Sequence, residues 1–87
     1  MQVRRSLTIY LEQNAQNARF LRAFAARLNT SLTKAGMSSA RVAALMRVST
    51  HDVQMWRQGV TIPSSAECQR LSELADSSVE WLCGTAA

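Results

Sequence analysis

The chain has 87 residues, of which 47% are hydrophobic and 18% charged, as in one small globular domain. Three glycines and one proline are too few for a loop-rich β-sandwich, and no apolar run approaches the roughly 18 residues of a membrane span. Residues 1–58 hold nine of the ten Lys and Arg residues against two acidic residues, a net charge of +7, whereas residues 59–87 hold one against four, a net charge of −3. This asymmetry suggests a molecule that a polyanion orients, although a solvated helix surface without a partner would give the same count.

The first sixteen residues fit two patterns. Leu7, Ile9 and Leu11 alternate as in a strand, but Leu7, Tyr10 and Leu11 also suit a helix. A helix continuous with the next one would carry the apolar spacing of a dimer seam, whereas a helix folded onto its own domain, or a partly ordered arm, is equally compatible. The seam would consist of Leu7, Leu11, Asn14, Ala18, Leu21, Ala25, Leu28 and Leu32. We assign residues 1–19 to an N-terminal extension that contributes to dimerisation, residues 20–84 to the main domain and residues 85–87 to a tail.

Five helices are predicted after this extension, because each has an apolar face and recognisable ends. The first spans residues 17–35 and ends at Gly36, and the second runs from a Ser38 cap to about residue 46. The third spans residues 50–58, with Ser49 as its cap and Gly59 at its end. Capping boxes at residues 64–67 and 77–80 open the fourth helix and a short fifth helix at residues 79–83.

Core residues are predicted on the inner faces of these helices. They are Val42, Ala43, Met46, Val53, Trp56, Cys68, Leu71, Leu74, Ala75 and Trp81. Cys68 and Cys83 are expected to be reduced core thiols in a cytoplasmic protein. One His and two distant Cys make a poor metal site, so neither a metal nor another cofactor is predicted.

Residues 38–59 predict a helix-turn-helix, in which two short helices flank a turn of about three residues and the small Ala43 allows close packing. The chain here resembles the lambda-repressor-like, Cro/CI and XRE-type helix-turn-helix domains over residues 20–84. The resemblance rests on Arg27-Leu28, Gly36-Met37-Ser38, Val42-Ala43, Val48-Ser49, Val53, Trp56, Gly59, Pro63 and Trp81-Leu82-Cys83-Gly84. It implies an all-α domain of five helices that binds double-stranded DNA.

Three positions depart from the pattern of that family. Arg47 replaces the turn glycine, so an arginine is expected in a left-handed conformation. Ser39 replaces a frequent Gln and weakens the usual contact with a phosphate, while Arg57 replaces a frequent Glu and adds positive charge near the DNA. These departures leave the predicted fold intact but change the expected phosphate contacts.

The outward face of the third helix contains the predicted base-reading residues. The resemblance assigns this role to Thr50, His51 and Met55, with Gln54 beside them. Gln can pair with adenine, Thr and Met can contact a thymine methyl, and His can donate to guanine. The predicted contacts with the DNA backbone are Lys34, Ser38, Ser39, Arg41, Ser49, Arg57, Gln58 and Thr61.

The function that the resemblance implies is a sequence-specific transcriptional regulator, a repressor of phage or prophage type. It would bind a pseudo-palindromic operator as a homodimer in the cytoplasm, on the nucleoid, under the control of its own concentration or of a regulatory protein partner. An antitoxin-type autoregulator and a protein-interaction module on the same scaffold are the alternatives. No nucleophile with a neighbouring base and no phosphate-binding glycine loop is found, so an enzyme is not predicted.

Overall fold

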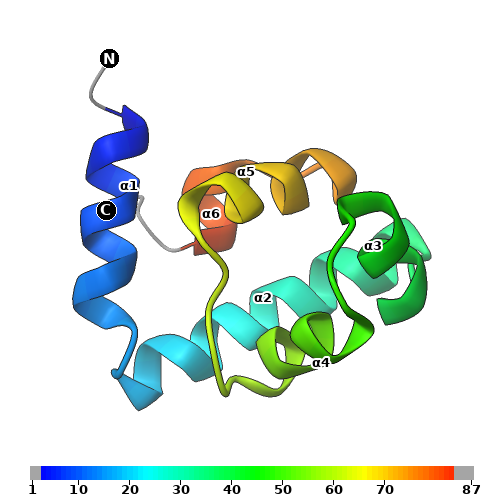
Figure 1. Ribbon diagram of the computed structural model, residues 1–87, viewed down its shortest axis with the longest axis horizontal. Helices are drawn as coiled ribbons and strands as arrows, with labels where there is room; N and C mark the ends of the chain where they lie inside the picture. The colour runs from blue at the N-terminus through cyan, green and yellow to red at the C-terminus, as the bar shows by residue number, and fades with distance from the viewer. Residues whose placement is uncertain (1–2, 84–87) are drawn as a thin grey trace.

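The computed structural model describes residues 3–83, which form six helices and no strand (Figure 1). The helices are α1 (Val3–Asn14), α2 (Ala18–Ala35), α3 (Ser39–Met46), α4 (Thr50–Gln58), α5 (Ser65–Leu74) and α6 (Val79–Cys83). The predicted all-α class is therefore confirmed for the described residues, while the expected tail at residues 85–87 lies outside them. Within the same range, no helix combines the length and the apolar character that a membrane span requires.

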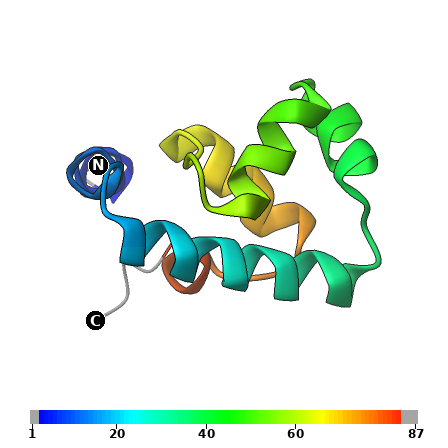
Figure 2. The same cartoon turned by 90° about the horizontal axis from the view of Figure 1, so that it is seen from below.

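Helix α2 is the longest and forms the base against which much of the molecule is arranged. It contacts α4 on one side and α6 on another, while α5 contacts α1, α3 and α6. Figure 2 shows α2 lengthwise and α1 almost end-on, so the first two helices cross steeply. The α3–α4 pair lies near the C-terminal half of α2, away from α1 (Figures 1 and 2).

Three residues, 15–17, separate α1 from α2. Asn17 has an extended conformation, and its side chain accepts a hydrogen bond from the backbone N–H of Phe20, so it caps α2 rather than continuing α1. The continuous helix, and with it the dimer seam, is therefore wrong. Leu7 and Leu11 instead lie in the chain's own core, which is the alternative of a helix folded onto its domain.

Most of the remaining helix ends are fixed by local hydrogen bonds, as predicted. Ser38 and Ser49 accept bonds from the backbone of Arg41 and Asp52, and Ser64 forms a complete capping box with Glu67. The second capping box is misplaced by one residue. Ser78 caps α6 by accepting a bond from the N–H of Trp81, whereas the Ser77 hydroxyl bonds to the Ala75 carbonyl and the Ser31 hydroxyl.

The apolar core joins all six helices. Phe24, Leu28, Leu32, Val42, Val53, Leu71 and Leu82 are completely buried, and Trp56 is 4% exposed. Trp81 was expected in this core, but its side chain is 44% exposed. A helix as short as α6 turns only part of its circumference inward, and Leu82 and Cys83 occupy that part.

Both cysteines are buried, free thiols, as predicted. The neighbouring Cys83 thiol and the burial of the site raise the pKa of Cys68 above its ordinary value. Cys68 is fully buried in the core and its thiolate is disfavoured, so it serves as a packing residue between α5 and α6.

Candidate nucleic-acid interface

Helices α3 and α4 form a tight helix-turn-helix whose turn consists of residues 47–49. Arg47 has φ 60° and ψ 42°, so the predicted left-handed arginine is confirmed. The N–H of Val48 donates to the Ala43 carbonyl at 3.1 Å and closes the end of α3. Val42 and Ala43 are buried at the crossing, where a larger side chain than Ala43 would push the helices apart.

Helix α4 is fastened to the body by its inner face and by its C-terminal end. Val53 is fully buried beside Trp56, and Gly59 ends the helix at φ 76°. A Cβ atom at Gly59 would lie 3.3 Å from the Leu21 carbonyl oxygen, so the backbones of this turn and of α2 approach closely. The opposite face of α4 is consequently held outward in a defined orientation.

The predicted base-reading residues occupy this outward face. Thr50, His51 and Gln54 are exposed, and Met55 is half-buried at the edge of the face. Gln58 is exposed one turn after Gln54. All these side chains are uncharged or weakly basic, and they present donors, acceptors and methyl groups of the kinds that distinguish bases in the major groove.

The predicted backbone-contacting residues fall into separate groups. Ser38 and Ser49 are exposed caps at the N-terminal ends of α3 and α4, and each hydroxyl keeps its hydrogen free to donate because it acts as an acceptor in the cap. Arg41 and Thr61 are exposed, the first on α3 and the second in the connector after α4.

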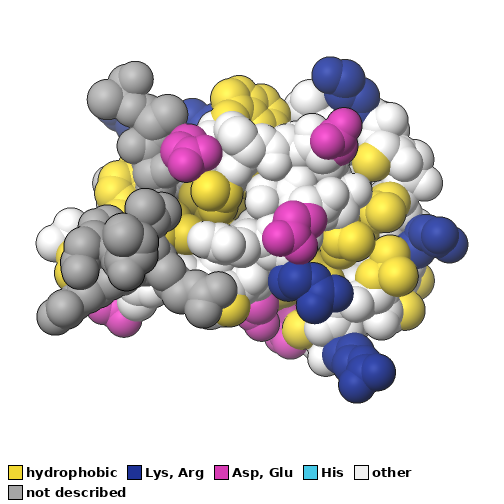
Figure 3. All heavy atoms as spheres, turned by 90° about the horizontal axis from the view of Figure 1, so that it is seen from above, with side chains coloured by type: hydrophobic (Ala, Val, Ile, Leu, Met, Phe, Trp, Pro, Cys, Tyr) yellow, Lys and Arg dark blue, Asp and Glu magenta, His cyan; other side chains and the backbone are white. Residues whose placement is uncertain are grey.

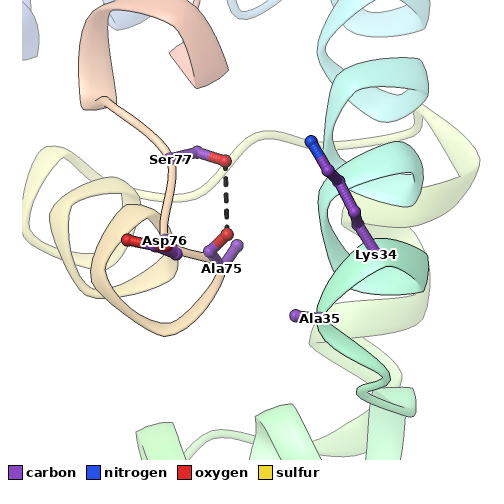
Figure 4. Close-up of a pocket in the computed structure, with 5 residues that line it drawn as sticks. All are labelled: Lys34, Ala35, Ala75, Asp76 and Ser77. Atoms are coloured by element: carbon purple, nitrogen blue, oxygen red, sulfur yellow. Dashed lines mark hydrogen bonds between the residues drawn. The ribbon is translucent and has the colours of Figure 1, made fainter.

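Lys34 lies outside the helix-turn-helix. It shares a hollow of about 270 Å³ with Ala35 on α2 and with Ala75, Asp76 and Ser77 in the turn between α5 and α6 (Figure 4). In this view the Lys34 side chain extends along α2 with its amino group toward the level of Ser77. Lys34 is exposed there, so it stays a predicted phosphate contact on a part of the surface separate from the helix-turn-helix.

Arg57 has partners inside the protein, which its sequence position did not reveal. Its Nε donates to Asn29 Oδ1 at 2.5 Å, and its Nη1 donates to Ser39 Oγ at 3.1 Å. Asn29 Nδ2 in turn donates to the Arg57 carbonyl oxygen at 3.0 Å. Three helices therefore meet at one half-buried guanidinium, and the side chain of Ser39 is drawn into the same network.

Arg70 also reaches the helix-turn-helix. Its Nη2 donates to the Leu45 carbonyl oxygen at 3.1 Å, in the last turn of α3, where carbonyl groups lack helical partners. No sequence pattern pointed to Arg70 or to Asn29, since both contacts join residues that lie at least 25 positions apart. Figure 3 shows a face on which Lys and Arg side chains lie mainly near the α3 end, with Asp and Glu closer to the middle.

Comparison with models of protein families, with curated proteins and with solved structures finds no match to this chain. A function must therefore be argued from the charge and the geometry of the chain itself.

Proposed function

We propose that the chain is a sequence-specific DNA-binding protein with a lambda-repressor-like fold that regulates transcription, as a Cro/CI-like repressor does. The observation that carries this proposal is the outward face of α4, where Thr50, His51 and Gln54 are exposed while Val53 and Trp56 anchor the opposite side. An exposed helical face of neutral hydrogen-bonding side chains suits the edges of bases better than it suits an apolar protein partner.

The surroundings of α4 support the same function. Residues 1–58, which include this helix, carry a net charge of +7, so long-range attraction favours a polyanion. The caps at Ser38 and Ser49 each supply an exposed hydroxyl at the positive N-terminal end of a helix, as a contact with phosphate requires. In the proposed complex α4 enters the major groove, and the first turn of α3 and the connector at Thr61 contact the backbone.

A single reading helix covers only a few base pairs, so the proposed molecule acts as a homodimer. Two copies related by a two-fold axis would place their α4 helices about 34 Å apart on a pseudo-palindromic operator, one helical turn from each other. Occupying such a site at a promoter excludes other proteins from it. An antitoxin-type autoregulator would use the same contacts and differ only in having a protein partner.

A protein-interaction module is the second candidate, and one observation favours it. Trp81 is 44% exposed on α6, and large aromatic side chains are enriched where proteins meet. This candidate involves a different surface from α4 and predicts no preference among DNA sequences.

Selection of bound sites from a pool of random duplexes tests the proposal. We expect enrichment of a pseudo-palindromic site, with two chains per duplex by sedimentation of the complex. Recovery of duplexes without any shared sequence would contradict specific reading by α4 and would favour the interaction module.

A further inference from the structure

The contacts of Arg57 assign it a task other than binding phosphate. Its side chain contacts Asn29 in α2 and Ser39 in α3, while its own carbonyl accepts a bond from Asn29. That carbonyl belongs to the last turn of α4 and lacks a helical partner. One amide side chain thus holds both the main chain and the side chain of residue 57.

The hydrogen bonds among Arg57, Asn29 and Ser39 fix the position of α4, the helix proposed to contact bases. Arg57 is next to the last residue of α4, and Ser39 is the first residue of α3, so their contact links the end of one helix to the beginning of the other. Asn29 of α2 bonds to the carbonyl and to the side chain of Arg57, so α2 is joined to the same network through Arg57. A shift of α4 against α3 would break these bonds, and small displacements of recognition groups are costly in specific binding.

The hydrogen bond from Arg57 also fixes the orientation of the Ser39 hydroxyl group. A hydroxyl has one hydrogen and two acceptor positions, and Arg57 Nη1 donates to Ser39 Oγ. The Ser39 hydrogen therefore points away from the guanidinium, and accepting a bond from a cation makes the hydroxyl a better donor. In the first turn of α3, a phosphate oxygen would be a suitable acceptor for it.

A direct contact between Arg57 and phosphate would compete with this arrangement. To turn its guanidinium group toward DNA, Arg57 would have to break the hydrogen bond from its Nε to Asn29 Oδ1, which is 2.5 Å long. Half-buried polar atoms of Asn29 and Ser39 would then lose their donor.

We propose that Arg57 is a positioning residue which, together with Asn29, holds α4 in register with α3 and orients the Ser39 hydroxyl toward the DNA backbone, and that it neutralises no phosphate itself. This inference rests on the proposed function and adds to it a role for Asn29, which would not touch DNA. Arg57 then contributes more to the discrimination between DNA sequences than to general affinity for DNA.

The test compares a selected operator with a random duplex of the same length across a range of salt concentrations. Arg57→Ala and Asn29→Ala are each expected to weaken operator binding at least about tenfold. Both should weaken binding to the random duplex much less, because only the Ser39 contact with the backbone is lost there, and both should keep the wild-type dependence on salt. The double variant should be no weaker than either single variant, because both changes remove the same unit.

Arg41→Ala is the matched control, since it removes an exposed arginine from α3. We expect it to weaken both duplexes by similar factors and to reduce the log–log salt slope by about one per binding site. Arg57→Lys separates charge from positioning. It keeps the positive charge but cannot hold Asn29 and Ser39 with a rigid fork, so it should resemble Arg57→Ala, and it serves as the test if the alanine variant fails to fold.

The outcomes distinguish this inference from the proposed function. A wild-type chain that binds operator, with Arg57→Ala behaving as Arg41→Ala does or with Arg57→Lys behaving as wild type, would overturn the positioning role alone. Full operator binding by Asn29→Ala would do the same. A wild-type chain that binds neither duplex would overturn the proposed function and the inference together.

Discussion

The two tryptophans of this chain have opposite surroundings and should respond to substitution in opposite ways. Trp56 is 4% exposed inside the helix-turn-helix, whereas Trp81 is 44% exposed on α6. Trp56→Ala would leave a large cavity and is expected to lower the free energy of unfolding by about 3–5 kcal/mol. Trp81→Ala should lower it by less than about 1 kcal/mol. Urea denaturation followed by circular dichroism measures both, and equal losses would mean that Trp81 is buried.

Arg47 combines a side chain with a backbone conformation that suits glycine. At φ 60° its Cβ crowds the following carbonyl, so Arg47→Gly is expected to raise the free energy of unfolding by up to about 1 kcal/mol. Arg47→Ala is the control, because it removes the exposed side chain and keeps the crowded Cβ. Thermal denaturation of both variants measures the difference. A gain in stability with alanine as large as that with glycine would attribute the effect to the charge instead.

At the scale of elements, two glycines show how much stability depends on the close approach of α4 to α2 and how much on a positive φ alone. Gly36 and Gly59 both have positive φ, but a Cβ at Gly36 would meet nothing within 4 Å, whereas one at Gly59 would lie 3.3 Å from the Leu21 carbonyl oxygen. Gly36→Ala should therefore cost about 1 kcal/mol of conformational strain, and Gly59→Ala should cost clearly more. Chemical denaturation of the two variants gives the comparison, and equal costs would show that α2 yields without strain.

Helix α1 contributes to the core of this same chain. Leu11 is 3% exposed, while Ile9, two residues earlier on the helix, is 46% exposed. Leu11→Ala should lower the free energy of unfolding by about 2–4 kcal/mol. Ile9→Ala, its matched control, should lower it by less than about 1 kcal/mol. If urea denaturation finds Leu11→Ala as stable as wild type, α1 does not pack as described.

The elements that the sequence predicted well are those whose ends depend on neighbouring residues. Serine caps, the glycines at positions 36 and 59 and the left-handed Arg47 act within one helical turn, so their residue types suffice. The sequence left open whether residues 1–16 continue into α2 or fold back as a separate helix, because an Asn can lie inside a helix as well as cap one. Trp81 was misplaced because the face that a five-residue helix buries depends on what it packs against.

In the candidate site, too, the features set by neighbouring residues could be predicted, and the contacts between distant helices could not. The exposure of Thr50, His51 and Gln54 could be derived from the helix period, because α4 has one clear apolar side. The partners of Arg57 could not, because Asn29 lies 28 positions earlier on another helix. Contacts of this kind depend on how helices cross, which local patterns do not specify.

For the whole molecule, the uneven charge predicts how binding depends on salt. If a dimer neutralises roughly six phosphates, the log–log slope of affinity against salt should be about −5. His51→Ala and Gln54→Ala carry no charge change and should keep this slope. Each should weaken operator binding by roughly 1–3 kcal/mol and leave random duplex binding almost unchanged. Paired titrations of both duplexes supply these values. A slope near zero would remove the electrostatic basis of the proposal.

The contact between α1 and α5 has a bearing on the lifetime of the protein. Thr8 and Ser65 share a hydroxyl hydrogen bond of 2.7 Å although they lie 57 positions apart, whereas α3 and α4 are neighbours along the chain. Closing a long loop costs more entropy than pairing adjacent helices, so α1 should dock late in folding and detach early in local unfolding. A cellular protease would then gain its first access at α1, and the detachment of this helix would set the rate of degradation.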